Sequence, residues 1–231
     1  MSFEPPPYPR IPHLFPQPER SRDDLVLAAE DRERFLCEPV IVEEKLDGAN
    51  VMLWLDGEGS VRAAGRSGIG GMDRAGQIGR LRAWAAERSD RLGTLLAEHR
   101  VLYAEWLLLT HTVHYDCLPD LLAGTDLHAP GIRFHTANER DRGLRRVGLT
   151  PVPRVFSGTL GAEKCLWALF GDSAFGSEPA EGLVLRRERE GRVFGRAKVL
   201  RPGFVRKSDE QWGGTVRLNA LAGKRRTAVP G

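Results

Sequence analysis

The sequence has only three cysteines, an odd number spread widely along the chain. Cys37, Cys117 and Cys165 form no Cys-x-x-Cys pair, which excludes a zinc ribbon and a disulfide framework. Long apolar runs are also missing, because no window approaches the roughly 18 apolar residues that a membrane-spanning helix needs. The N-terminus shows no basic stretch followed by an apolar core, so a secretory signal is not expected. A cytoplasmic protein is therefore expected.

A strong excess of one charge is missing too. Thirty-four Lys and Arg residues oppose 31 Asp and Glu residues, and the net charge of +3 excludes a histone-like protein. The basic residues are nevertheless concentrated between positions 186 and 226, where they can lie along a phosphate backbone or form an ordinary solvated surface. With 231 residues, 41% of them hydrophobic, the chain is long enough to bury a core.

Proline and the hydrophobic pattern divide the chain into an arm, a domain and a tail. Seven prolines within residues 1–19 remove amide hydrogens and fix φ, so residues 1–20 are expected to form an extended arm. Residues 21–207 are expected to form an α+β domain built on antiparallel sheet, followed by a short tail over 208–231. The periodicity predicts helices over 22–36, 78–98 (with Gly93 as a break point), 138–147 and 163–170, strands over 40–46, 50–55, 61–64, 101–109 and 132–134, a loop over 65–79, a hairpin over 181–187 and 191–200, and a helical or irregular tail from Ser208.

Lys45 stands where a predicted strand meets the Asp47–Gly48 turn, with Glu43 and Glu44 before it. One interpretation is an exposed lysine paired with surface carboxylates, which is common. The other is a nucleophilic amine. An amine attacks only when it is unprotonated, which requires desolvation or a nearby cation. The acidic neighbours fit the second interpretation if they hold Mg²⁺ or Mn²⁺ beside the lysine.

Two further carboxylates stand in unusual places. Glu105 lies in the apolar run 101–109, where a carboxylate needs a compensating partner unless it faces solvent. Glu181 precedes Gly182, so it is either an ordinary turn residue or a second acid of a site. Both alternatives are open for each residue when it is taken alone.

Five short segments together resemble the covalent nucleotidyltransferases, a superfamily of DNA ligases, RNA ligases and mRNA capping enzymes. They occur in the order of that superfamily as Lys45-Leu46-Asp47-Gly48, Gly65-Arg66-Ser67-Gly68, Tyr103-Ala104-Glu105-Trp106, Glu181-Gly182-Leu183-Val184-Leu185-Arg186 and Arg196-Ala197-Lys198-Val199. Within the superfamily, the chain most resembles the ATP-dependent RNA ligases related to the second phage RNA ligase. That resemblance includes Asn50 and the run from His111 to Asp116, and it extends from Tyr8 to about Leu221, with Trp212 and Asn219 near its end.

The resemblance implies a ligase adenylation fold, with antiparallel sheets flanked by helices around a nucleotide cleft. It also implies an enzyme that uses ATP and Mg²⁺ or Mn²⁺ to join 5′-phosphate and 3′-hydroxyl ends of RNA, including nicked duplexes. Lys45 would be the nucleophile that takes up AMP. The residues that the resemblance assigns to the nucleotide are Glu44 (adenine amino group), Glu105 and Glu181 (ribose), Arg66, Arg196 and Lys198 (phosphate), and Asn50, for which it names no particular group. The residues that it assigns to the metal are Asp47, Glu105 and Glu181.

The sequence departs from the family pattern in two places. The adenine-stacking aromatic residue that related ligases carry about twenty positions after the strand glutamate would fall at Thr125, so Tyr115, Phe134 or a shifted register would have to supply the ring. Only residues 199–231 follow Lys198, so most of a C-terminal nucleic-acid-binding domain is expected to be missing. The chain would then be a minimal ligase, or a helper protein would hold the nucleic-acid ends.

Two other functions are weighed beside RNA ligation. The first is an adenylyltransferase that acts on DNA nicks or another acceptor with a partner subunit. The second is a nucleic-acid-binding module that has lost catalysis. The acids at positions 47, 105 and 181 argue against the second, because carboxylates without a metal repel phosphate.

Overall fold

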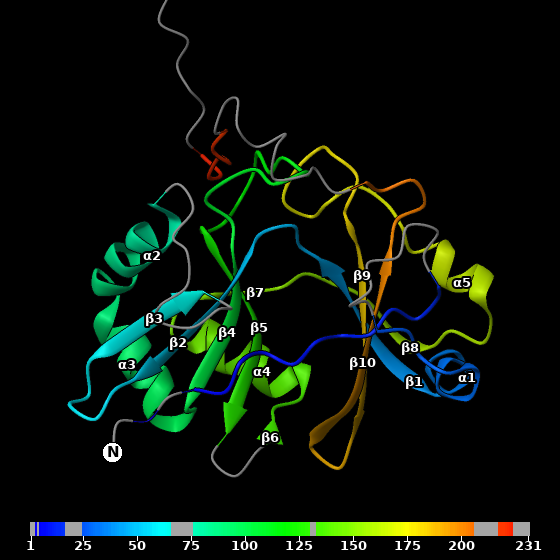
Figure 1. Cartoon of the computed structure of the whole chain (residues 1–231), viewed down its shortest axis with the longest axis horizontal. Helices are drawn as coiled ribbons and strands as arrows, with labels where there is room; N and C mark the ends of the chain where they lie inside the picture. The colour runs from blue at the N-terminus through cyan, green and yellow to red at the C-terminus, as the bar shows by residue number, and fades with distance from the viewer. Residues whose placement is uncertain are drawn as a thin grey trace, which may run out of the picture.

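The structure is a computed structural model that describes residues 3, 5–16, 25–65, 76–129, 133–205 and 217–223. Within them the chain forms two predominantly antiparallel sheets with helices at the periphery, which confirms the predicted α+β class (Figure 1). The helices are α1 (Ala29–Cys37), α2 (Gln77–Ala86), α3 (Ser89–Glu98), α4 (Ala137–Arg146) and α5 (Glu163–Trp167). The strands are β1 (Pro39–Lys45), β2 (Ala49–Leu55), β3 (Val61–Gly65), β4 (Val101–Trp106), β5 (Leu122–Ala129), β6 (Arg133–Phe134), β7 (Thr150–Pro151), β8 (Arg154–Thr159), β9 (Gly182–Arg189) and β10 (Arg192–Leu200).

The turn between β1 and β2 joins the two sheets. The first sheet has four strands in the order β10-β9-β1-β8, and the second has the order β3-β2-β4-β5-β6, with β7 paired to β5. Lys45, the last residue of β1, is opposite Gly182 of β9, whereas Asn50 of β2 is opposite Glu105 of β4. Residues 46–48 therefore connect the end of β1, which carries Lys45, to the start of β2, which carries Asn50.

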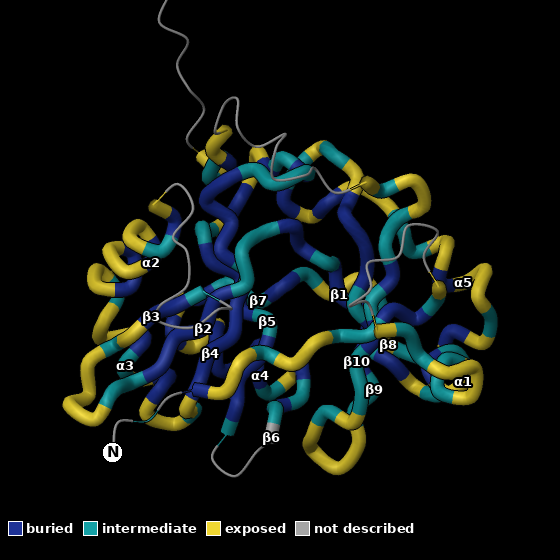
Figure 2. The backbone as a smooth tube through the Cα atoms, in the orientation of Figure 1, coloured by how far each residue is buried: buried dark blue, intermediate teal, exposed yellow. Residues whose placement is uncertain are grey.

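Each sheet packs its apolar face into its own core. Residues such as Leu53 and Leu102 of the second sheet pack on α2, α3 and α4, and Val42 and Leu185 of the first sheet pack with Phe35 of α1. Figure 2 shows these strands as buried and the helices as partly exposed. Because side chains alternate along a strand, the opposite face of the second sheet carries Met52 and Tyr103, which pack against Tyr8 of the N-terminal arm, together with Asn50 and Glu105.

The proline-rich arm crosses the front of the molecule from the second sheet to β10 (Figure 1). At one end the hydroxyl of Tyr103 donates to the carbonyl oxygen of Pro6 at 2.6 Å. At the other, the amide of Lys198 donates to Pro12 and its carbonyl accepts from Leu14, at 2.8 and 2.9 Å. These bonds place the described part of the arm along the edge of β10, which would otherwise expose unpaired backbone groups.

Two predictions for the elements were wrong. Helix α1 begins at Ala29, not near position 22, because Leu27 instead donates its amide to His13 of the arm at 2.9 Å. The long helix over 78–98 is two helices, and the break lies at Glu87 and Arg88, whereas Gly93 lies within α3. The tail was predicted to be helical or irregular, and the part of it that the structure describes, 217–223, is irregular, with isolated β-bridges.

Strands β5 and β8 were missed entirely. Gly124 and Asp126 interrupt the hydrophobic pattern of β5, and β8 is an edge strand with mostly exposed or half-exposed residues. Residues 206–216 and 224–231 of the tail lie outside the described part. Of the helices described here, none is long and apolar enough to span a bilayer.

Candidate active site

Lys45 and Glu181 meet where β1 and β9 pair. The Nζ of Lys45 donates to Oε2 of Glu181 at 2.6 Å, and the side chains are 18% and 1% exposed. Glu181 precedes β9, whose first residue, Gly182, is opposite Lys45. The interpretation of Lys45 as a solvated surface lysine is therefore wrong, because its partner is a buried acid and most of its side chain is covered.

Glu105 belongs to the same electrostatic cluster, although it lies on the second sheet. It is opposite Asn50, whose Nδ2 donates to its Oε1 at 3.5 Å, so both side chains are on one face. Burial raises the pKa of Glu105 to about 7; nearby Lys45 opposes the rise, and Glu181 adds to it. The structure thus brings together four of the predicted residues, Lys45, Asn50, Glu105 and Glu181.

Asp47 is fixed by the loop 107–118. Its Oδ2 accepts the amides of Thr112 and Val113 at 2.6 and 2.9 Å, and its own amide donates to the hydroxyl of Tyr115 at 2.7 Å. Its Oδ1 is buried without a hydrogen-bond partner. This backbone anchoring holds the turn that follows Lys45.

Gly48 allows that turn to pack closely on β4. A Cβ at this position would lie 2.8 Å from the carbonyl oxygen of Trp106 and 3.3 Å from Oε2 of Glu105. A side chain would therefore push the turn away from the end of β4. Here a glycine is required for close approach rather than for its backbone angle.

Asp47, Glu105 and Glu181 were predicted to share a metal ion, but the structure does not place all three carboxylates around one point. Among the residues that the structure describes, no group of three or more His, Cys, Asp and Glu side chains is placed to hold a metal ion. One oxygen of Asp47 is engaged by backbone amides, whereas Glu181 adds to the raised pKa of Glu105 beside Lys45. Oxygen ligands with excess negative charge suit a divalent cation, so Glu105 and Glu181 fit one and Asp47 retains only its Oδ1.

Glu44 lies on the other face of β1. Because side chains alternate, it is on the side of Val42 rather than that of Lys45. The hydroxyl of Ser173 donates to its Oε1 at 2.5 Å, and the amide of Ala174 to its Oε2 at 2.9 Å. Burial raises the pKa of Glu44, and these two hydrogen bonds oppose the rise. Both oxygens predicted to face adenine are thus engaged by the 173–174 turn, which no sequence motif signals.

Arg196 and Lys198 share one face of β10, but Arg196 is engaged in a buried cluster. Its guanidinium lies 3.0 Å from Oδ1 of Asp126 and 4.2 Å from the ring centre of Phe134. Arg186 lies 2.9 Å from the same oxygen of Asp126. Although burial opposes ionisation, Arg186 and Arg196 hold the pKa of Asp126 well below its usual range. The prediction of a basic surface from position 186 onward is wrong at Arg186, which is 1% exposed.

The arm reaches this cluster through Tyr8. Its hydroxyl donates to Asp126, and its ring lies 4.9 Å from that of Tyr103. Burial and the nearby carboxylate raise the pKa of Tyr8 well above its usual range. Asp126 and its arginines therefore join the two sheets and the arm. The sequence pattern did not reveal this cluster, since Asp126 interrupts an otherwise apolar strand.

Neither suggested aromatic residue offers an open ring for adenine. Tyr115 is fully buried, and its hydroxyl is used by Asp47. Phe134 is half-buried, with the guanidinium of Arg196 over its ring. Thr125 lies at a register shift between β4 and β5, so a bulge stands where related ligases place the ring. Arg66 and Trp212 lie outside the described residues.

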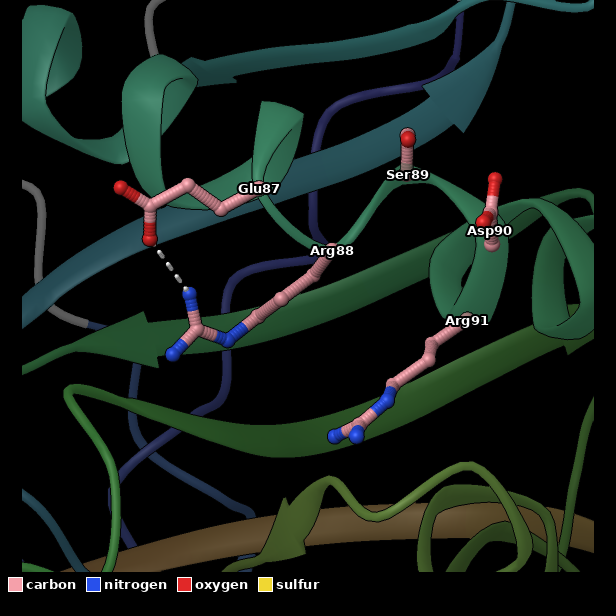
Figure 3. A pocket seen from close by; sticks show the side chains of 5 residues that line it. All are labelled: Glu87, Arg88, Ser89, Asp90 and Arg91. Carbon is pink, nitrogen blue, oxygen red and sulfur yellow. Dashed lines mark hydrogen bonds and ion pairs between the residues drawn. The ribbon is translucent and has the colours of Figure 1, made fainter.

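A separate hollow of about 350 Å³ lies at the turn between α2 and α3 (Figure 3). Its lining residues are Glu87, Arg88, Ser89, Asp90 and Arg91. Arg88 is already paired with Glu87 at 3.2 Å and stacks over Trp84. None of the predicted site residues lines this hollow.

Comparison with known proteins identifies the family to which the chain belongs. The family model described as RNA ligase matches residues 38–200, which includes Lys45, Glu105, Glu181 and Lys198. A search among curated protein sequences found no significant match.

Among solved structures, the chain is similar to the RNA ligase of Naegleria gruberi. The match to that enzyme with pyrophosphate has a TM-score of 0.55 at 16% identity, over 86% of this chain and 61% of the other. A mutant with ATP and Mn gives 0.55 at 16% identity, over 87% and 62%, and an apo mutant gives 0.56 at 15%, over 86% and 61%. These matches show a shared fold, and this chain spans about half to three fifths of the Naegleria chains. Since the family model covers most of the chain and includes its clustered lysine and acids, the chain belongs to the RNA ligase family.

Proposed function

We propose that the chain is an ATP-dependent RNA ligase that carries AMP on Lys45. The observation that carries this proposal is the amine of Lys45, 2.6 Å from the buried carboxylate of Glu181 and electrostatically coupled to Glu105. A buried acid, Glu181, and a half-buried one, Glu105, beside one partly exposed lysine suit a nucleophile that meets a phosphate and a divalent cation. The family match and the ATP- and Mn-bound Naegleria structures support the same assignment.

In the first step, Nζ of Lys45 attacks the α-phosphorus of ATP. The bond from that phosphorus to the bridging oxygen breaks, pyrophosphate leaves, and the nitrogen loses its proton as the phosphoramidate forms. In the second step, a 5′-phosphate oxygen of RNA displaces the lysine and takes the AMP. In the third, a 3′-hydroxyl attacks the RNA 5′-phosphorus and releases AMP. Glu181 orients the amine for the first step through its 2.6 Å hydrogen bond.

Charge on the phosphate oxygens must be neutralised in each step. Glu105 and Glu181 are the residues that would hold Mg²⁺ or Mn²⁺, which supplies part of that neutralisation when bound. Lys198 and Arg66 would contact phosphate, and Asn50 would orient Glu105 beside the ribose. Arg196 is paired with Asp126, and Glu44 accepts hydrogen bonds from Ser173 and Ala174, so phosphate and adenine would compete with these partners.

Label transfer from α-labelled ATP tests the proposal. The chain is incubated with the nucleotide and Mg²⁺ or Mn²⁺, denatured, and examined for a label that resists alkali and is lost in warm acid, as a phosphoramidate is. We expect labelling by ATP in preference to GTP and none in Lys45→Ala. Lys164→Ala, which removes an exposed lysine from α5, is the matched control and should label normally. No adduct in the unmodified chain under any of these conditions would refute the proposal.

The substrate is proposed to be RNA with 5′-phosphate and 3′-hydroxyl ends, present as a nick in a duplex, in the cytoplasm. Residues 21–207 are proposed as the catalytic domain, with end binding completed by a helper protein. Labelled chain is offered nicked RNA, single-stranded RNA and nicked DNA, and formation of the adenylylated 5′ end and of the sealed product is followed separately. Sealing of nicked DNA alone would favour a DNA-directed enzyme instead.

A further inference from the structure

Asn219 is buried between the loop 107–118 and the segment 217–223, more than a hundred residues apart in the chain. Leu218 and Leu221 of the segment form isolated bridges with Leu109 and Leu118. The backbone amide of Asn219 donates to the carbonyl oxygen of Leu108 at 3.1 Å, and only 8% of the residue is exposed. Backbone bridges thus attach the segment to the loop on both sides of Asn219.

The side-chain amide of Asn219 uses its whole hydrogen-bonding capacity on that loop. Its Nδ2 donates to the carbonyl oxygens of Leu107 and Leu109, at 2.9 and 3.1 Å. Its Oδ1 accepts from the hydroxyl of Thr110 at 2.8 Å and from the amide of Tyr115 at 3.0 Å. An asparagine amide has two donor hydrogens and two acceptor lone pairs, and all four are satisfied here.

The same loop holds Asp47 at three points. The amides of Thr112 and Val113 bind its Oδ2, and the hydroxyl of Tyr115 accepts its amide hydrogen. These three residues lie within the stretch 109–115, and Asn219 is hydrogen-bonded to both ends of this stretch. The backbone of the loop therefore has one geometry in which it satisfies both Asn219 and Asp47.

We infer that Asn219 is a positioning residue of the adenylylation site, which acts through the loop 107–118 to fix Asp47 and the turn after Lys45. This inference rests on the proposed function. Asn219 touches no reacting atom; it sets the peptide groups at 112 and 113 that bind the carboxylate. Misplacement of that turn moves Lys45 relative to Glu181, and a displacement of about 1 Å is enough to cost about 10²-fold in rate.

An aspartate at 219 is the sharpest test, because it keeps the size and changes the hydrogen bonding. Asn219→Asp places a carboxylate oxygen against the carbonyl oxygens of Leu107 and Leu109, which removes two donors and adds repulsion. Thr110→Val removes only one of the four hydrogen bonds. Leu221→Ala is the matched control, since it weakens apolar packing of the same segment without touching the amide of Asn219.

Two measurements are made on the full chain. The first is the single-turnover rate constant of labelling with α-labelled ATP at several Mn²⁺ concentrations, recorded separately from the final labelled fraction. We expect Asn219→Asp to lower the rate constant at least tenfold, Thr110→Val to lower it less, and Leu221→Ala to leave it near normal. A reduced labelled fraction with an unchanged rate constant in Asn219→Asp would show a role in folding only and would overturn the inference.

The second measurement is amide hydrogen exchange at Thr112 and Val113 without nucleotide or metal. Both amides are bonded to Asp47, so we expect faster exchange in Asn219→Asp and no change at amides of β1 or β2. Unchanged exchange at these two positions would contradict the inference even if labelling fell. If the unmodified chain takes no label, the proposed function fails, and the exchange experiment still decides whether Asn219 fixes the loop.

Discussion

Glu43 and Arg140 form an ion pair that both sheets bury, with Nη2 of Arg140 2.5 Å from Oε1 of Glu43 and side chains 3% and 0% exposed. Glu43 is two residues before Lys45 on β1, so the two side chains share a face of that strand. Arg140 belongs to α4, whose start is fixed by a capping box between Thr136 and Glu139. The strand that presents the nucleophile is therefore held by a buried charge from a helix of the other half of the molecule.

Breaking this pair should destabilise the fold strongly. Arg140→Met leaves Glu43 and Asp141 buried without their main cation, and loss of one partner of a buried pair costs about 3–5 kcal/mol. Denaturant unfolding measures the change. Arg146→Ala, which removes the exposed pair with Glu98, is the control and should have only a small effect. An equal loss of unfolding free energy in the two variants would show that burial does not determine how much an ion pair contributes to stability.

Glu181→Gln should impair catalysis without unfolding the chain. Glutamine keeps the volume of the buried side chain but removes the negative charge that binds Lys45 and would help to hold the cation. We expect the labelling rate with ATP to fall roughly a hundredfold, in the range found when one charge-stabilising group is removed from an active site. The melting temperature is recorded alongside. Glu163→Gln on the exposed side of α5 should leave labelling unchanged, and an active Glu181→Gln would remove this residue from the mechanism.

The local parts of this site are the parts that the sequence could predict. Strands β1 and β2 with the Asp47–Gly48 turn, and the hairpin of β9 and β10, depend on neighbouring residues and are found as predicted. Contacts between distant residues have no such signal. Glu43 and Arg140 are 97 positions apart, and Glu44 and Ser173 are 129 positions apart. Their pairing is set by how the sheets pack, which a one-dimensional pattern does not contain.

Gly182 lies so close to the backbone of β10 that a side chain has no room there. A Cβ there would overlap the carbonyl oxygen of Val199 and lie 3.1 Å from the Cα of Leu200. Gly182→Ala should therefore push β9 away from β10 and displace the adjacent Glu181. We expect both a lower melting temperature and a lower labelling rate with ATP. Gly171→Ala, where a Cβ would meet no atom within 4 Å, is the matched control. Normal stability of Gly182→Ala would mean that the hairpin adapts without strain.

His99, which packs against His135, should make the fold sensitive to acid. Nδ1 of His99 lies 2.9 Å from Nε2 of His135, and burial together with His135 lowers the pKa of His99. Glu98 and Glu139 oppose this shift, whereas Arg146 adds to it. The folded state therefore binds fewer protons than the unfolded state as pH falls below roughly 6.5, the unfolded value.

The contribution of His99 to the free energy of unfolding should thus be constant above about pH 7. The free energy of unfolding should fall as pH is lowered from about 6.5 through the folded pKa of His99. Burial and His135 also lower the pKa of His128, which adds to the same trend. His99→Asn keeps a hydrogen-bonding group near His135 but removes the titration. Denaturant unfolding at pH 8 measures the packing cost of the variant, and the same measurement at pH 5.5 should show a smaller acid-induced loss than in the unmodified chain. An equal loss in both proteins would assign the acid sensitivity to other groups.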